Sequence, residues 1–304
     1  METNQPVDPS PAHKCGYVAI IGKPNAGKST LINALMGQKM SIVTDKPQTT
    51  RHRILYLLSE DDYQLIVLDT PGLVEPRYHL HEIMMKNVQR AVEDADLVIF
   101  LTDTRTKIPD EEGLKLLGNK PSMLIINKLD LIDERQTLPL AEAYLRKHPF
   151  NEIIPVSALK GTNMDVVLKL MIEYLPEGPA LYPKDMLSEH PNRFFVSEII
   201  REKIFELFSN EIPYSTQVNI ANYKEGDSHR KDVIDAEIVV DKKSQKGILI
   251  GKNGDAIKKV GQEAREDIEA FIGRPVYLQL FVKVREDWRN STGLLNSFGY
   301  GKSS

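Results

Sequence analysis

Short apolar runs alternate with segments of helical period through the first 175 residues of the chain. Each run is almost continuously hydrophobic, which is typical of strands covered by helices on both faces. This alternation predicts an α/β domain with a mostly parallel sheet. Residues 53–58 and 63–68 are separated by only four residues, so they are expected to form a hairpin with one antiparallel edge strand. The runs of the predicted parallel sheet cover residues 17–21, 65–68, 97–101, 123–126 and 153–156.

The pattern changes after residue 176, where prolines interrupt a polar stretch. Such a stretch predicts a semi-rigid connection between domains. A helical period, two alternating strands, a helix, a Gly-Lys-Asn-Gly loop, a second helix and a last strand follow, which predicts a small α+β domain. The expected division is a disordered tail at 1–14, an α/β domain at 15–176, a linker at 177–192, an α+β domain at 193–290 and a C-terminal tail at 291–304.

Composition adds a few limits to this picture. The length of 304 residues is consistent with two domains, and no apolar run is long enough to span a bilayer. A single cysteine, Cys15, excludes an internal disulfide and fits a reducing compartment. The formal net charge of −4 gives no overall signal for nucleic acid, although lysines cluster in the second domain.

The first candidate site is a glycine-bounded loop between the first strand and a helix, in the pattern G-x-x-x-x-G-K-[ST]. Its glycines let successive N–H groups point at an anion, and the helix N-terminus favours negative charge at the same place. Lys28 is expected to reach the β- and γ-phosphates, and the Ser29 hydroxyl to hold Mg²⁺. The predicted phosphate loop comprises Gly22, Lys23, Pro24, Asn25, Ala26, Gly27, Lys28, Ser29 and Thr30.

The second candidate motif is Asp-Thr-Pro-Gly at the carboxyl end of a strand, the edge where open α/β sheets bind their ligands. Asp69 can bind a water of the Mg²⁺ shell, and the Gly72 N–H can donate to a γ-phosphate. Because that bond requires a triphosphate, the following segment is expected to reorder on hydrolysis. Two histidines in that segment, His79 and His81, are expected to lie in a solvated loop. The motif and its flank are Asp69, Thr70, Pro71, Gly72 and Leu73.

The base is expected to be selected by Asn-Lys-Leu-Asp, again directly after a strand. A carboxylate such as Asp130 is acceptor-only, so it matches the two adjacent donors of guanine and not adenine. Lys128 can lay its alkyl stem over the base, and the Ala158 N–H can reach the guanine O6. The sequence therefore predicts GTP or GDP as ligand. The predicted base-binding residues are Asn127, Lys128, Asp130, Ser157, Ala158 and Leu159.

Taken together, the phosphate loop, Gln-Thr-Thr-Arg-His at residues 48–52, and the Asp-Thr-Pro-Gly, Asn-Lys-x-Asp and Ser-Ala-Leu motifs resemble the translation-factor-related small GTPases of the ribosome-assembly type. The resemblance implies a Ras-like P-loop GTPase in which Thr50 ligates Mg²⁺ and reads the γ-phosphate, although nothing local favours Thr50 over Thr49. Leu73 stands where Ras-like enzymes place a water-orienting Gln. The resemblance implies that Asn25 helps to hold a monovalent cation such as K⁺ instead; a simple turn residue is the alternative. The residues expected to act in hydrolysis are Lys28, Thr50, Gly72 and Asn25.

The lysine-flanked Gly-x-x-Gly loop lies between two helices and matches a KH module, which clamps single-stranded nucleic acid. Glycines let phosphates approach closely, and lysines supply charge. The element order is that of the prokaryotic, type II KH domain. The alternative is a helix-linking turn with a solvated basic face. The predicted RNA-binding residues are Lys246, Gly251, Lys252, Asn253, Gly254, Lys258 and Lys259.

A GTPase of this type followed by a KH domain resembles the bacterial Era GTPase family along almost the whole chain. The resemblance implies binding to the 3′ end of 16S rRNA, a role in maturation of the small (30S) ribosomal subunit, a cytoplasmic monomer and Mg²⁺ as cofactor. It leaves open whether the protein also associates peripherally with the inner face of the cell membrane. Two alternatives are a signalling switch whose second domain binds protein or lipid, and an RNA-binding module with a degenerate nucleotide domain.

Overall fold

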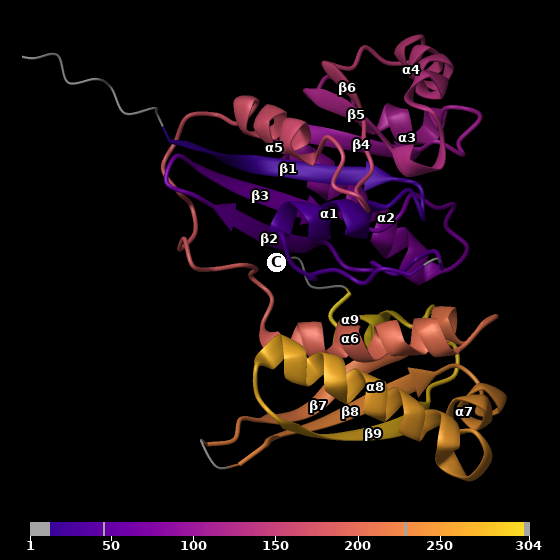
Figure 1. Ribbon diagram of the computed structural model, residues 1–304. Helices are drawn as coiled ribbons and strands as arrows, with labels where there is room; N and C mark the ends of the chain where they lie inside the picture. Colours follow the sequence, from indigo (N-terminus) through magenta and orange to yellow (C-terminus); the bar gives the residue numbers. More distant parts are fainter. Residues whose placement is uncertain (1–12, 45, 228–229, 301–304) are drawn as a thin grey trace, which may run out of the picture.

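The first domain is a six-stranded sheet, seen in a computed structural model that describes residues 13–44, 46–227 and 230–300 (Figure 1). The strand order is β2-β3-β1-β4-β5-β6. All neighbouring strands are parallel except β2 and β3, which form the expected hairpin. The α/β class predicted for this half of the chain is confirmed. Its strands are β1 (Lys14–Gly22), β2 (Ile54–Ser59), β3 (Tyr63–Asp69), β4 (Leu97–Asp103), β5 (Ser122–Asn127) and β6 (Glu152–Pro155).

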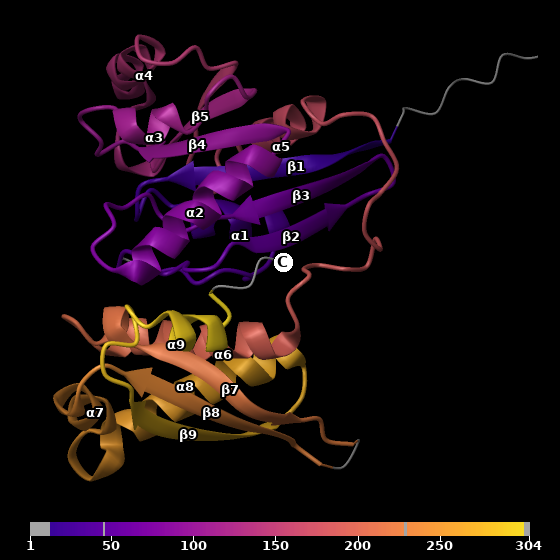
Figure 2. The same ribbon diagram turned by 180° about the vertical axis from the view of Figure 1, so that it is seen from behind.

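Helices cover both faces of this sheet, as the two opposite views show (Figures 1 and 2). Helices α1 and α5 pack against one face, and α2, α3 and α4 pack against the other. Successive residues of β1 face opposite layers, so Val18 and Ile20 join one core and Ala19 and Ile21 the other. The apolar runs are continuous for this reason. The helices are α1 (Lys28–Met36), α2 (His79–Asp94), α3 (Glu111–Lys115), α4 (Leu138–Leu145) and α5 (Met164–Glu173).

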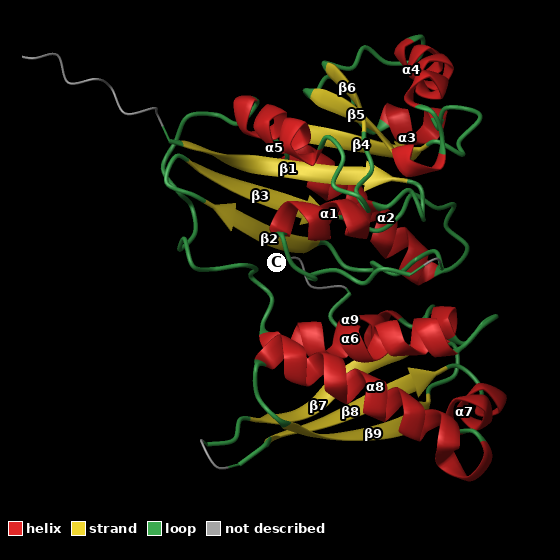
Figure 3. Cartoon of the chain, viewed as in Figure 1, coloured by secondary structure: helices red, strands yellow, loops and turns green. Residues whose placement is uncertain are grey.

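The second domain is a three-stranded sheet with helices packed on it (Figure 3). Strand β8 is central, antiparallel to β7 and parallel to β9. Apolar faces of α6 and α8 form its core with the sheet. The predicted α+β order is confirmed. Its elements are α6 (Asn192–Leu207), β7 (Gln217–Lys224), β8 (Asp232–Val240), α7 (Lys243–Ile250), α8 (Asp255–Ile272), β9 (Val276–Val284) and α9 (Thr292–Ser297).

The expected C-terminal tail at 291–304 is wrong for its described part. Residues 292–297 form α9, and Leu295 and Tyr300 are buried with Trp288 between the domains, against Leu80 of α2. The reason is that their apolar side chains fill the space between two elements that are distant in sequence. No helix among the described residues has the length and apolarity needed to cross the membrane.

The two other segments outside the predicted domains are the N-terminal tail, which is only partly described, and the linker, which is described completely. Of the N-terminal tail expected at 1–14, the structure describes His13 and Lys14, and Lys14 already begins β1. The linker expected at 177–192 lies against the edge of the first domain, where the Leu57 N–H donates to the Leu187 carbonyl at 2.9 Å. Backbone hydrogen bonding therefore restrains the connection between the domains.

Candidate nucleotide site and RNA-binding surface

The phosphate loop joins β1 to α1, and two of its glycines are required by close packing. A Cβ on Gly22 would overlap the Leu101 carbonyl oxygen, and one on Gly27 would overlap the Asn127 side-chain nitrogen. Gly27 also has φ 99°, which L side chains rarely adopt. The loop therefore lies directly against β4 and against the residue expected to bind the base.

Lys28 is buried at the start of α1, and its ammonium donates to the carbonyls of Gly22 (2.9 Å) and Lys23 (3.1 Å). Burial lowers the pKa of Lys28, an effect that the charge of Asp69 opposes. Burial likewise raises the pKa of Asp69, against the charge of Lys28. Each charge is held out of water, so a phosphate group and a cation entering the loop would each meet an opposite charge that water screens poorly.

Asp69 ends β3 and is fully buried. Its Oδ2 accepts from the hydroxyls of Ser41 (3.2 Å) and Thr50 (3.4 Å), whereas its Oδ1 is buried and has no hydrogen-bond partner among the described residues. A buried carboxylate oxygen without a partner is costly, and a metal-bound water would satisfy it. The residue set of Ser29, Thr50 and Asp69 therefore fits Mg²⁺. Thr49, in contrast, presents its backbone carbonyl to Arg201 of the second domain.

Gly72 and Leu73 continue from this strand toward the phosphate loop. A Cβ on Gly72 would lie 2.8 Å from the Pro24 side chain, so the two loops touch. The Leu73 N–H donates to the Gly22 carbonyl at 3.1 Å, and its side chain packs against the core beneath α3. The Leu73 side chain is therefore part of the packed core, and it has no polar group that could orient a water molecule.

The side chains of the predicted base-binding residues are oriented by hydrogen bonds to the phosphate loop and to one another. The Asn127 side chain donates to the Ala26 carbonyl (2.9 Å) and accepts from the Ala158 N–H (3.0 Å). The exposed Asp130 carboxylate accepts from the Ser157 hydroxyl at 2.5 Å. These bonds orient the carboxylate with its remaining acceptor positions open to a base.

Two charged residues that the sequence analysis missed complete this end of the site. Asp103, at the end of β4, accepts from the Lys128 ammonium (2.7 Å) and from the Arg105 guanidinium (2.8 Å). Arg105 and Lys128 also line a cavity of about 370 Å³ together with the phosphate loop and Thr50. The sequence did contain a signal for Asp103: like Asp69, it stands at the end of a continuous apolar run.

The predicted RNA loop follows α7 directly. Gly251 and Gly254 have φ of 74° and 83°, and Asn253 between them also has a positive φ of 54°. Lys252 and Lys258 are exposed, and the Lys258 stem lies beside Gly254. The loop thus presents tightly turned backbone with lysines around it. Of the other predicted lysines, Lys246 is half-buried, and Lys259 is exposed and lies 3.8 Å from Glu263.

A groove of about 470 Å³ extends from this loop between α8 and β9, which sequence reasoning had not located. Gly261 lies within α8, and packing does not require a glycine at this position. A Cβ there would make only an ordinary contact with Leu280 at 3.5 Å. A glycine within a helical pattern was the signal available in the sequence. The lining residues are Ile257, Lys258, Gly261, Gln262, Arg265, Leu278 and Leu280.

The histidines after the Asp-Thr-Pro-Gly motif are not both solvated. His81 is buried under Tyr78, and its ring lies 3.2 Å from the Gln48 side-chain oxygen. Burial lowers its pKa to about 4, so the ring is neutral near pH 7. Both histidines lie in α2 rather than in a loop, and the expectation of solvation is wrong for His81, because Tyr78 and Gln48 cover its ring.

The strand order, the phosphate loop and the carboxylate of Asp130 define a P-loop GTPase, here joined to a KH domain. Comparison with family models agrees: residues 17–128 match the 50S ribosome-binding GTPase family, and residues 211–289 match the KH domain family. A chloroplastic ERA-like GTPase of Arabidopsis thaliana is 51% identical over 96% of this chain and 70% of its own length. GTPase ERA1 of Zea mays, also chloroplastic, is 50% identical over 95% and 71%. The chain belongs to the Era family of GTPases.

Solved structures of the family superpose on nearly the whole chain. Era of Aquifex aeolicus, in a variant bound to GDP·AlF4⁻, has a TM-score of 0.91 and 43% identity, with 95% of this chain and 100% of that chain covered. A complex of Era with MgGDPNP and nucleotides 1506–1542 of 16S ribosomal RNA gives the same values. The similarity therefore includes the arrangement of the two domains.

Proposed function

We propose that this GTPase is an assembly factor of the small ribosomal subunit and binds the 3′ end of 16S rRNA through its KH domain. The observation that carries the proposal is the presence, in one chain, of a guanine-nucleotide site and of a glycine-lysine loop beside a groove lined by both basic and apolar side chains. The Era complex with nucleotides 1506–1542 of 16S rRNA supports this choice of RNA. We infer a monomer that acts in the cytoplasm, where the subunit is assembled.

Each part of the phosphate site has a role in this proposal. The loop N–H groups and the Lys28 ammonium bind the β- and γ-phosphates, and the Gly72 N–H donates to the γ-phosphate. Ser29 and Thr50 would hold Mg²⁺ directly and Asp69 through a water, which the unpartnered Oδ1 of Asp69 supports. When bound, Mg²⁺ neutralises charge that develops between the β- and γ-phosphates.

Hydrolysis should be about tenfold faster in KCl than in NaCl at matched concentration, because a bound K⁺ beside Asn25 would stabilise the negative charge that develops between the β- and γ-phosphates, and Leu73 offers no polar group for hydrolysis. Asn25→Gly is the suitable variant, since Asn25 has φ 64° and glycine keeps that conformation without strain. Single-turnover rates in both salts test this. Equal rates for the parent protein in the two salts would remove K⁺ from the mechanism.

Gly254→Asp should weaken binding of an RNA oligonucleotide with the 16S 3′-terminal sequence by about 10- to 100-fold, because a carboxylate would face the phosphates. The added Cβ has room, with the nearest atom of Lys258 at 4.0 Å, whereas at Gly251 a Cβ would lie 2.7 Å from Ala256. Fluorescence anisotropy at one fixed salt concentration measures the affinity.

Gly254→Asn is the matched control, because asparagine has the same shape, tolerates positive φ and adds no charge. It should retain most of the RNA affinity. Equal affinity of Gly254→Asp and the parent would exclude this loop as the RNA clamp and favour a second domain that binds protein or lipid. A parent protein that prefers an unrelated oligonucleotide would remove the 16S 3′ end as the target.

A further inference from the structure

Arg51 is buried in the interface between the domains, although the nucleotide site does not use its charge. Its side chain is 2% exposed. The guanidinium donates to three backbone carbonyls of the second domain: Thr216 at 2.7 Å, Pro213 at 3.0 Å and Tyr214 at 3.1 Å. Among the described residues it forms no ion pair with a carboxylate. The guanidinium carbon lies 5.9 Å from the centre of the Trp288 ring.

A buried guanidinium without a carboxylate is a costly way to fill this space. Burial lowers the pKa of Arg51, which reflects the loss of hydration. An apolar side chain of similar volume would avoid that cost. The planar fork, however, holds its three acceptors in one fixed geometry, which a Lys or an apolar residue cannot do. The arrangement therefore favours precise placement of the Arg51 backbone over simple stability.

The segment around Arg51 is held to the second domain at several points. The Thr49 carbonyl accepts from Arg201 of α6, and the Val43 N–H donates to Glu202 at 3.2 Å. Lys46 donates to the carbonyl of Phe205 in the last turn of α6 and to that of Phe208, directly after the helix, at 2.5 Å. These contacts flank Thr50, whose hydroxyl lies beside Asp69.

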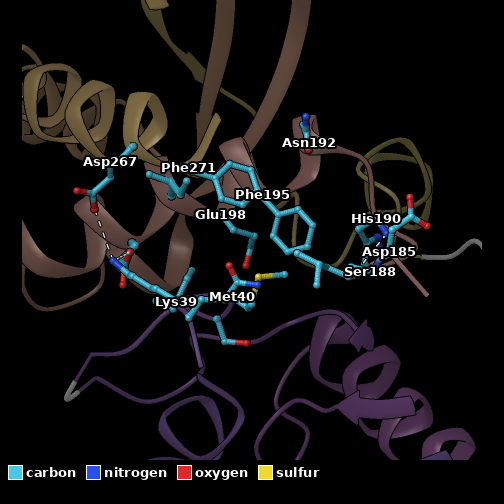
Figure 4. Close-up of a pocket in the computed structure, with 17 residues that line it drawn as sticks. Lys39, Met40, Asp185, Ser188, His190, Asn192, Phe195, Glu198, Asp267 and Phe271 are labelled. Atoms are coloured by element: carbon cyan, nitrogen blue, oxygen red, sulfur yellow. Dashed lines mark hydrogen bonds and ion pairs between the residues drawn. The ribbon is translucent and has the colours of Figure 1, made fainter. Parts of the chain in front are cut away.

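One side of the interface, opposite the packed cluster of Leu80, Trp288 and Tyr300, is less closely packed. A cavity of about 620 Å³ separates the domains on the side of Lys39 and Phe271 (Figure 4). Lys39 spans it with ion pairs to Glu202 (2.7 Å) and Asp267 (3.5 Å). Because this side is hollow, the contacts around Arg51 carry much of the restraint on the Thr50 segment.

We propose that Arg51 is a positioning residue of the GTPase site: by binding the carbonyls of residues 213–216 it holds Thr50 beside Asp69, so that the KH domain completes the γ-phosphate side of the site. This inference rests on the proposed role of Thr50. GDP lacks the γ-phosphate, so the contribution of Arg51 should appear with the triphosphate and be nearly absent with the diphosphate.

The test compares the affinities of GDPNP with Mg²⁺ and of GDP, measured by displacement of a fluorescent guanine nucleotide from the full-length protein. Arg51→Ala should weaken GDPNP binding by about tenfold or more and GDP binding by about twofold or less. The ratio of these two losses of affinity measures the contacts to the γ-phosphate that the variant has lost. Arg51→Lys should fall between, because an ammonium cannot reproduce the fork. Arg53→Ala is the matched control: Arg53 pairs with Asp94 at 2.5 Å within the first domain.

Equal weakening of both nucleotides, or of neither, would overturn the proposal, because a purely structural role does not distinguish GDPNP from GDP. If Arg51→Ala does not fold, as judged from thermal melting, Arg51→Lys decides: a GDPNP-to-GDP ratio equal to that of Arg53→Ala overturns the proposal. Thr50→Ala separates the two assumptions. An unchanged ratio in that variant refutes the role of Thr50, whereas a changed ratio there with a normal ratio in the Arg51 variants refutes the inference on Arg51 alone.

Discussion

Replacing Asp130 by Asn should reduce GTP affinity by about 10²- to 10⁴-fold and create affinity for XTP. Guanine presents two adjacent donors, N1–H and the exocyclic amino group, and the Asp130 carboxylate accepts both. An amide retains one acceptor and places its NH2 against the second donor. Loss of two hydrogen bonds to a charged group is worth roughly 3–6 kcal/mol, which gives the stated range. Xanthine carries a carbonyl at that position, so the amide donor matches it.

The geometry supports this exchange without loss of structure. The Ser157 hydroxyl donates to one Asp130 oxygen at 2.5 Å, and an Asn side-chain oxygen can accept the same bond. Competition of GTP, ITP and XTP against a fluorescent guanine nucleotide measures the effect, and ITP isolates the contribution of the exocyclic amino group. Asp133→Asn is the control, because Asp133 caps a nearby turn through the Arg135 N–H. A variant at Asp130 that binds GTP as tightly as the parent would refute the base-pocket assignment.

Lys28→Ala should abolish measurable GTP binding, with a loss of about 10²- to 10³-fold, while the unliganded protein remains folded. Removing one partner of a buried charge pair typically costs about 3–5 kcal/mol. In the nucleotide complex the pair would consist of the Lys28 ammonium and the phosphates, and the variant leaves the phosphates without their partner. In the absence of nucleotide the Lys28 ammonium is bound by two carbonyls and desolvated. Its removal takes away a charge that is costly to bury but also the opposite charge beside the buried Asp69 carboxylate, so the melting temperature of the unliganded variant should fall without loss of the fold.

The measurement is the rise in melting temperature on addition of GTP and Mg²⁺, which follows from ligand affinity. The parent and Lys23→Ala should both show it, since Lys23 belongs to the same loop but is 57% exposed and lies 3.8 Å from Asp110. Lys28→Ala should not. A normal rise in that variant would mean that the loop backbone alone binds the phosphates, and a collapse of the unliganded protein would mean that Lys28 is mainly structural.

The Era family assignment and the two-domain fold could be predicted because they depend on patterns that are local in the chain. Continuous apolar runs follow from strands buried on both faces. The three residues between β2 and β3 permit only a tight hairpin, which places the antiparallel strand at the edge. The glycines at positions 22 and 27 could be predicted from the motif of one strand-loop-helix unit, although the atoms that exclude a Cβ there belong to β4 and β5.

Contacts between distant segments could not be predicted in the same way. Asp103 joins the base site only because β4 lies beside β5, and the groove beside Gly261 exists only because β9 pairs with β8. Tyr300 has a side chain that suits a tail equally well, and its burial depends on how the two domains dock, whereas His81 is buried by Tyr78 and by the distant Gln48.

The sequence by itself thus determined the type of each domain, the ligand class and the motifs whose residues are predicted to contact the phosphates and the base. These features depend on the order of residues within short segments, where backbone geometry leaves few alternatives. Only the tertiary structure decided what Arg51 contacts, where the C-terminal helix packs and which residues line the groove. Those features depend on side chains from separate elements that meet across an interface. A pattern along the chain carries no information on which distant elements lie side by side.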